Sequence, residues 1–235
     1  MKVHGEFDYV IVGGGSAGCV LAARLSEDPE TSVLLLESGI AASRIRHPLL
    51  SVPAAFFLYT GRSPFNWDFT GEPEPHAGGR RVQVPRGKGL GGSSIINGMM
   101  YQRGHPRDYD RWRESGLDGW GYADVLPYFR RAERSWRGES PYHGGDGPVP
   151  VSMNDAATVG YEALRQAAAA AGHSVSEDHG RLPEGVGPTE TTIGRGRRAD
   201  AATVYLRPAL HRSNLTVTAR AHASRLLLEN GRCVG

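Results

Sequence analysis

Three glycines near the N-terminus, Gly13, Gly15 and Gly18, have the spacing G-x-G-x-x-G. In this spacing the first glycine permits a tight turn, the second lets a pyrophosphate approach the main chain, and the third lets a helix pack closely on a strand. Ser16 and Ala17 lie in the same turn and would add backbone N–H groups at the positive end of a helix. The pattern therefore predicts a turn that binds the phosphates of a dinucleotide.

An acidic residue, Glu37, follows at the end of the next apolar run. At the carboxyl end of a strand, a carboxylate can accept hydrogen bonds from ribose hydroxyls, and its charge disfavours a 2′-phosphate. The alternative is that Glu37 only caps or solvates the end of the strand. The glycines and Glu37 predict a ligand that contains ADP, but they do not separate a nicotinamide from a flavin dinucleotide.

A second glycine-rich segment, VPRGKGLGGSSIINGMMYQRG, runs from Val84 to Gly104. It combines bare backbone with apolar side chains such as Ile95, Ile96 and Met99. A large ligand that lies directly on the main chain would explain this combination. The alternative is a structural loop in which the same apolar side chains provide the packing.

Hydrophobic periodicity predicts the elements that position these residues. Tyr9–Val12 is continuously apolar and predicts a buried strand, Ala17 to Leu25 has helical spacing, and TSVLLLESG predicts a second buried strand. Strand, glycine turn, helix and strand fit into about 30 residues, which is the size of a β-α-β unit with a parallel sheet. We therefore expect an α/β protein with a Rossmann-like sheet.

The remainder of the chain is expected to consist of short elements joined by ordered loops. The expected features are a long excursion from Ile40 to Val82, two short helices separated at Gly116–Gly121 with Asp124 as a cap, a helix from about 156 to 171, a helix that closes before Pro208, and a hairpin at Asn230-Gly231.

Composition excludes several classes of function. The 27 basic and 25 acidic residues give a net charge of +2, which is too balanced for a nucleic-acid-binding surface. Cys19 and Cys233 lie far apart, so no disulfide framework is expected. The N-terminus predicts neither a signal peptide nor a transmembrane segment. A cytoplasmic location is expected, with peripheral membrane association as the alternative.

Other candidate residues have simpler interpretations. The histidines show no metal-ligand spacing, and surface or capping roles are expected for His47, His76, His105, His143, His173, His179, His211 and His222. No metal site is expected. The Arg195–Arg198 stretch is interpreted as a solvated turn, and Phe65, Trp67 and Phe69 as a core patch or as the shield of a cavity.

Four blocks of the sequence together resemble one enzyme family. FDYVIVGGGSAGCVLAARLSEDPETSVLLLESG, NWDFTGEPEP, RRVQVPRGKGLGGSSIINGMMYQRGHPRDYDRW and AATVYLRPALHRSNLTVTARAHASRLLLENG are similar to consecutive blocks of the glucose-methanol-choline (GMC) oxidoreductases, and the resemblance extends from Phe7 to the last residue. Members of this family are flavoproteins that oxidise alcohols with FAD. The text is most similar to the branch of choline dehydrogenase-like and alcohol dehydrogenase-like members.

The resemblance implies how the second glycine-rich segment is used. An isoalloxazine ring needs a flat, partly apolar bed with a few hydrogen-bond donors at its polar edge. The positions that match FAD contacts of the family are Gly91, Gly92, Ser93, Asn97, Gly98 and Met100. Ala223 matches a position whose backbone reaches the adenine, although plain packing explains an alanine equally well. Some members attach FAD through a histidine at the position of Ile96, so noncovalent FAD is expected here.

The resemblance also implies an activity and a domain division. FAD-dependent hydride transfer from an alcohol carbon to flavin N5 is expected, with choline or a primary alcohol as substrate and oxygen or a quinone as acceptor. The catalytic histidine of the family lies near the C-terminus, beyond this sequence, so no catalytic residue is assigned. We expect an FAD-binding domain at 1–150, the start of an α+β substrate domain at 151–195, and a truncated return to the FAD domain at 196–235. The alternative is an FAD-binding fragment without activity.

Overall fold

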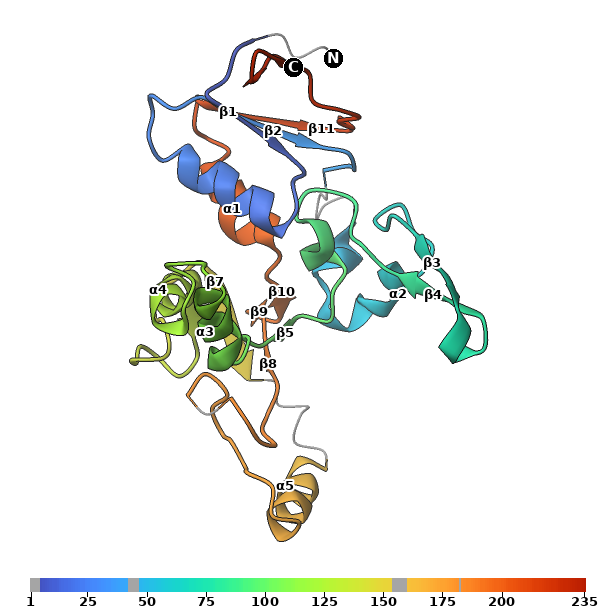
Figure 1. Cartoon of the computed structure of the whole chain (residues 1–235), viewed down its shortest axis with the longest axis vertical. Coiled ribbons are helices and arrows are strands. Elements are labelled where there is room, and N and C mark those ends of the chain that lie inside the picture. Colours follow the sequence, from blue (N-terminus) through green and yellow to red (C-terminus); the bar gives the residue numbers. More distant parts are fainter. Residues whose placement is uncertain (1–4, 42–46, 154–159, 182) are drawn as a thin grey trace. The chain divides into compact units, whose positions relative to one another are not determined.

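The computed structural model describes residues 5–41, 47–153, 160–181 and 183–235. The chain divides into two units (Figure 1): the first unit combines Met1–Gly98 with Arg198–Gly235, and the second unit is Met99–Arg197. The sequence-based division instead began the second domain at residue 151 and ended it at residue 195. Residues 99–153 and 160–197 share a sheet in the structure, so they fall in one unit. Which unit binds which ligand remains a prediction.

A parallel sheet forms the centre of the first unit. Its strands are β1 (Tyr9–Val12), β2 (Val33–Glu37) and β11 (Leu215–Ala219), in the order β1-β2-β11. Tyr9 and Leu215 both pair with Val33, one on each side of β2. The predicted α/β class with a parallel sheet is confirmed.

The two predicted strands differ in burial. β2 is buried as expected, whereas Tyr9, Val10 and Val12 of β1 are each about half exposed. The prediction of a buried first strand is therefore wrong. β1 lies at the edge of the sheet, where only one neighbouring strand covers it.

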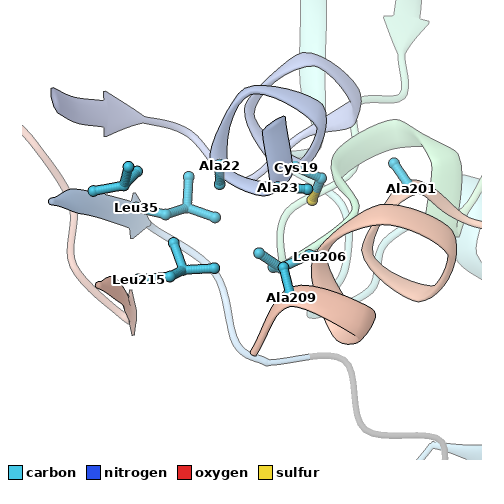
Figure 2. Close-up of a cluster of buried hydrophobic side chains, with 9 residues drawn as sticks. Cys19, Ala22, Ala23, Leu35, Ala201, Leu206, Ala209 and Leu215 are labelled. Carbon is cyan, nitrogen blue, oxygen red and sulfur yellow. The ribbon is translucent and has the colours of Figure 1, made fainter. Parts of the chain in front are cut away.

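Small side chains hold the helices of the first unit against the sheet. Helix α1 (Ser16–Leu25) places Cys19, Ala22 and Ala23 in the core, opposite Leu206 and Ala209. Figure 2 shows these residues converging on Leu35 and Leu215 of the sheet. The strand–helix–strand unit predicted from periodicity is confirmed, and the tight packing leaves the N-terminus of α1 fixed next to the end of β1.

The helix near Pro208 does not end where the sequence predicts. A π-helical segment, η6 (Ala202–Leu206), continues into α6 (Arg207–Ala209), so Pro208 lies inside a helical stretch. A proline inside a helix removes one backbone hydrogen bond, and here the wider π-helical turn lies directly before it. The prediction that the helix closes before Pro208 is therefore wrong.

The described part of the long excursion after β2, from residue 47 onward, packs on a small core of its own. It contains η1 (Pro48–Ser51), η2 (Pro53–Ala55), α2 (Phe57–Thr60), β3 (Phe69–Glu74), η3 (Pro75–Ala77) and β4 (Arg80–Val84), and β3 pairs antiparallel with β4. Leu50 and Phe65 pack against Ile95 and Ile96 of the second glycine-rich segment, which forms η4 (Gly92–Ile95). The excursion therefore supports the second glycine-rich segment by packing against its apolar side chains.

The predicted C-terminal hairpin is confirmed. β12 (Leu228–Glu229) pairs antiparallel with β13 (Arg232–Cys233). Asn230 and Gly231 between them both have positive φ, as a tight hairpin turn requires.

The second unit contains a mixed sheet. Its strands are β5 (Met100–Tyr101), β6 (Glu133–Ser135), β7 (Val149–Met153) and β8 (Glu190–Thr191), in the order β5-β8-β7-β6; β6 and β7 are parallel and the other pairs antiparallel. A short β-hairpin follows, from β9 (Ile193–Gly194) to β10 (Arg197–Arg198).

The helices of the second unit follow the sequence prediction. α3 (Pro106–Glu114) and α4 (Tyr122–Ala132) are separated as expected, and the Asp124 carboxylate accepts the Gly121 N–H 3.1 Å away. α5 is Tyr161–Ala170, and the predicted residues 156–159 lie outside the described part.

Within the described ranges, no helix is long and apolar enough to cross a membrane.

A buried ionic cluster joins the loops of the second unit. His143 Nδ1 lies 2.9 Å from a Glu133 oxygen and His143 Nε2 lies 2.9 Å from Asp178 Oδ1, while Arg103 pairs with the other Glu133 oxygen. The hydrogen bond to Glu133 raises the pKa of His143 above its ordinary value of 6.5. The expected surface role of His143 is therefore wrong: the histidine is buried between Glu133, which is 10 residues away in sequence, and Asp178, which is 35 residues away.

Candidate functional site

The glycines of the first turn have different structural reasons for lacking a side chain. Gly13 has φ of +97° and donates its N–H to the carbonyl of Leu36 at 2.8 Å. A Cβ on Gly18 would overlap the carbonyl oxygen of Gly13, so this glycine permits close packing of helix on strand. Gly15 has an ordinary φ of −76°, and a Cβ there would meet only the Gly92 Cα, at 3.9 Å. Among the described residues, no contact requires glycine at position 15.

The N-terminus of α1 is suited to an anion. The helix has 10 residues and no acidic side chain in its first turn, so its positive end is not neutralised from within. Behind this turn, burial raises the pKa of the Cys19 thiol to about 12. Cys19 is therefore a neutral packing group at physiological pH, and its Sγ donates to the Gly14 carbonyl 3.2 Å away.

Glu37 connects the end of β2 to the glycine turn. One carboxylate oxygen accepts the Gly14 N–H at 2.8 Å, the other accepts the Gly39 N–H at 2.7 Å, and the residue is 5% exposed. The capping alternative is therefore part of its role in this structure. A carboxylate has lone pairs beyond these two, so the capping bonds leave acceptor capacity for a ligand hydroxyl.

The two glycine-rich segments pack backbone against backbone. The Gly91 N–H donates to the Gly14 carbonyl at 2.7 Å. A Cβ on Gly92, whose φ is +53°, would lie 2.6 Å from the Gly15 Cα. The alternative of a structural loop therefore explains Gly92, and the contact brings both segments to one place.

A cavity of about 430 Å³ opens where these two segments meet. It is lined by Val12, Gly13, Gly15, Ser16, Leu36, Glu37, Ser38, Trp67, Arg86, Gly87, Gly92, Ser93, Ala221, His222 and Ala223. All of these residues belong to the first unit. The cavity lies at the carboxyl ends of β1, β2 and β11, which is where ligands bind in open parallel sheets.

The structure brings most of the predicted site residues to this cavity. Those that line it are Gly13, Gly15, Ser16, Glu37, Gly92, Ser93 and Ala223. Ala17, Gly18 and Gly91 lie in the same two turns but outside the lining. Asn97 and Gly98 lie in the first unit without lining the cavity, and Met100 lies in the second unit beside a separate cavity of about 80 Å³.

The comparisons with known proteins decide the family. The sequence profile of GMC oxidoreductases matches residues 7–235. This chain belongs to the GMC oxidoreductase family. Over 231 residues, 98% of the chain, it is 47% identical to an oxygen-dependent choline dehydrogenase of Brucella anthropi, and it spans 41% of that protein's length.

Solved structures share the fold over nearly the whole chain. Pyridoxine 4-oxidase from Mesorbium loti matches with a TM-score of 0.87 and 37% identity, over 97% of this chain and 45% of that one. An FAD-dependent oxidoreductase from Chaetomium thermophilum matches with a TM-score of 0.83 and 28% identity, over 98% and 41% of the two chains.

Several residues that line the cavity of this GMC family member were not predicted as site residues from the sequence. Trp67 lines it, with Lys88 Nζ 4.5 Å from the centre of its ring, and His222 Nδ1 lies 3.1 Å from the Ser38 hydroxyl. Trp67 comes from the excursion, and for it the alternative of a residue that shields a cavity fits the structure, whereas Phe65 belongs to the buried core. Ser38 follows Glu37 and His222 precedes Ala223 in the sequence, so their position next to predicted site residues could have identified them.

The expectation of a solvated turn at Arg195–Arg198 is wrong for its last residue. Arg198 is 2% exposed. Its Nε donates to the Leu50 carbonyl at 3.1 Å, and its Nη1 lies 3.1 Å from the Ser94 carbonyl, 2.7 Å from the Asn97 carbonyl and 2.7 Å from Asn97 Oδ1. Burial lowers the pKa of Arg198, although the hydrogen bonds keep the guanidinium solvated by protein.

Proposed function

We propose that this chain binds FAD and forms the cofactor-binding part of an oxidoreductase that acts on the CH–OH groups of alcohols. One observation carries the proposal: two glycine-rich turns, around Gly15 and Gly92, meet at the end of a parallel sheet around a cavity that Glu37 also lines. The relative from Chaetomium thermophilum, described as FAD-dependent, supports the choice of cofactor.

Different residues of the site would hold different parts of FAD. The phosphates bind the main chain of the first turn, at Gly13, Gly15, Ser16 and Ala17, where Gly18 holds the helix in place. Glu37 accepts the ribose hydroxyls and the backbone of Ala223 reaches the adenine. The second segment would hold the flavin ring at Gly91, Gly92, Ser93, Asn97 and Gly98 of the first unit, and a contact of the ring with Met100 stays a prediction. Ile96, which is buried in the core under this segment and has no nucleophile, leaves FAD noncovalently bound.

Bound FAD supplies an acceptor, flavin N5, for the hydride that leaves the alcohol carbon. The residues of this chain would hold the cofactor and orient it; the proton of the alcohol is not assigned to any of them. Choline or a primary alcohol is the proposed substrate class, supported by the choline dehydrogenase relative. Oxygen or a quinone is the proposed acceptor. The free cysteines Cys19 and Cys233 fit a reducing, cytoplasmic compartment, with or without peripheral membrane association.

A binding titration tests the proposal directly. The purified chain is titrated with FAD while flavin fluorescence is followed, and NADH is added as a competitor. We expect saturable FAD binding that NADH does not displace, and release of all flavin on denaturation. Tight binding of NADH without FAD binding would contradict the cofactor, and flavin that stays with the precipitated protein would contradict noncovalent attachment.

Turnover distinguishes the proposal from its alternative. The FAD-loaded chain is mixed with choline and a series of primary alcohols, and the reduction of an artificial dye is recorded beside free FAD. Dye reduction above free FAD would assign the activity to this chain. FAD binding without dye reduction would favour the alternative of a cofactor-binding fragment without activity of its own.

A further inference from the structure

His222 lines the cavity of the first unit, although no sequence motif assigned a role to it. The residue is exposed, and its chain neighbours Ala221 and Ala223 line the cavity as well. Its Nδ1 lies 3.1 Å from the Ser38 hydroxyl, and within the described part of the chain Nε2 forms no hydrogen bond. The imidazole ring therefore has both polar and apolar surface left for a ligand.

The turn after β11 brings His222 to the end of β2. Arg220, the first residue after β11, has φ of +59°, a conformation that is uncommon for a residue with a side chain. Its N–H donates to the Gly39 carbonyl at 2.9 Å. The Ala221 N–H donates to the Glu37 carbonyl, also at 2.9 Å. The backbone before His222 is therefore held in place by the end of β2 without the help of a ligand.

A second aromatic ring, from a different segment, lies next to His222 in the cavity. The centres of the Trp67 and His222 rings are 5.9 Å apart, and their planes are tilted by 56°. The Trp67 N–H donates to the Arg86 carbonyl at 2.9 Å, and the Oδ1 of the buried Asn66 accepts the Arg86 N–H at 3.0 Å. Trp67 and His222 thus form a preformed aromatic corner, each ring on a backbone that is fixed by hydrogen bonds.

We propose that this aromatic corner binds the adenine base of FAD and that the His222 ring contacts the base directly. The inference rests on the proposed function, in which Glu37 accepts the ribose hydroxyls and the backbone of Ala223 reaches the adenine. Ser38 follows Glu37, and His222 precedes Ala223. An adenosine that extends from Glu37 to Ala223 therefore passes the hydrogen-bonded pair of His222 and Ser38.

The chemistry of His222 suits a purine. An aromatic ring gains free energy by stacking on a nucleobase or by meeting its edge. The edge of adenine carries a donor, the N6 amino group, next to an acceptor, N7. When the Ser38 hydroxyl donates to Nδ1, Nε2 of His222 carries a hydrogen and can donate; when Nδ1 donates, Nε2 can accept. Both tautomers can therefore form a hydrogen bond with adenine.

The decisive variant is His222→Ala, which removes the ring at an exposed position and should change the melting temperature little. We expect the Kd for FAD and the Kd for ADP both to rise about tenfold, the size of one aromatic contact with a base. Titration calorimetry measures both constants. Unchanged constants would overturn the proposal. Weaker binding of FAD with unchanged binding of ADP would assign His222 to the flavin end of the cofactor and would overturn the proposal as well.

His222→Phe tests whether the ring itself makes the contact. The phenyl group keeps an aromatic surface at this position but cannot form hydrogen bonds. We expect it to recover most of the lost affinity, with both Kd values within about threefold of the wild type. Binding as weak as that of His222→Ala would contradict an aromatic contact with the base.

Two controls separate this inference from the proposed function. His211→Ala, which removes another exposed histidine of the first unit that does not line the cavity, should leave both Kd values unchanged. Failure of the wild-type chain to bind FAD would contradict the proposed function itself. Wild-type binding together with an unaffected His222→Ala would contradict only the role of His222.

Discussion

Gly15 and Gly18 lie in one turn, yet they are glycines for different reasons. At Gly18 a side chain would overlap the carbonyl of Gly13, so the fold itself demands glycine. At Gly15 the protein offers room and an ordinary backbone conformation. A bare Cα that the fold does not require is best explained by a ligand that needs the space.

Alanine substitutions at the two glycines should therefore affect different properties: FAD binding at Gly15 and stability at Gly18. Gly15→Ala should weaken FAD binding at least tenfold with little change in melting temperature, because the methyl group occupies the place of the pyrophosphate. Gly18→Ala should lower the free energy of unfolding by about 1–3 kcal/mol through overpacking. Calorimetry and an FAD titration on both variants check this. Equal FAD affinity in Gly15→Ala and wild type would move the phosphate site elsewhere.

Glu37 combines a structural and a binding role, so its removal should affect both. In Glu37→Gln an NH₂ group replaces an oxygen that accepts the N–H of Gly14 or Gly39. A buried donor left without an acceptor costs about 1–3 kcal/mol of stability. We expect a lower melting temperature together with weaker FAD binding. A loss of affinity at unchanged stability would show that the two backbone bonds matter less than the ribose.

At the scale of elements, the sequence predicts what local patterns determine. The β1-α1-β2 unit and the 230–231 hairpin follow from periodicity and from turn residues, which act over a few positions. The burial of Arg198 and His143 could not be predicted because their partners lie far away in sequence: Leu50 and Asn97 for the first, Glu133 and Asp178 for the second. The candidate site was predictable where a motif occupies it, whereas at Trp67, in the aperiodic excursion, the sequence left a core patch and the shield of a cavity as alternatives.

The ionic cluster of the second unit should make its stability depend on pH. The pKa of His143 is raised in the folded state, so its contribution is fully present below about pH 6.5 and is lost as pH rises through the higher folded pKa. Burial is the largest single influence on Asp178 and opposes its ionisation, but the hydrogen bond and the charge of His143, the Arg181 backbone N–H and the charge of Arg137 together lower the pKa of Asp178. Its contribution is present above about pH 3.8 and is lost as pH falls through the lower folded pKa.

Thermal unfolding between pH 5 and pH 9, about the range in which histidine titrates, measures this dependence. The wild type should lose stability toward the alkaline end. His143→Gln should be less stable throughout and should lack that alkaline decline. A wild-type melting temperature that is flat across the range would show that the cluster does not titrate.

At the scale of the whole molecule, the first unit is discontinuous: its two stretches flank the second unit in sequence. Ligand binding should therefore stabilise segments that are far apart in the chain. With FAD at about 100 times its Kd, the gain is about 2.7 kcal/mol. Amide hydrogen exchange should slow at 11–18 and 36–39, at 86–97 and again at 221–223. Protection confined to the first of these stretches would contradict a site built from both ends of the chain.

The tryptophans are divided between the units in a way that gives each an optical signal of its own. Of the four in the chain, Trp67 belongs to the first unit and lines its cavity, whereas Trp112, Trp120 and Trp136 belong to the second. Subtracting the emission of a Trp67→Phe variant from that of the wild type isolates the indole at the cavity. ADP, which does not absorb in the emission range, should quench this difference signal while leaving the emission of the variant unchanged. Occupancy of one unit and unfolding of the other can then be followed in a single cuvette.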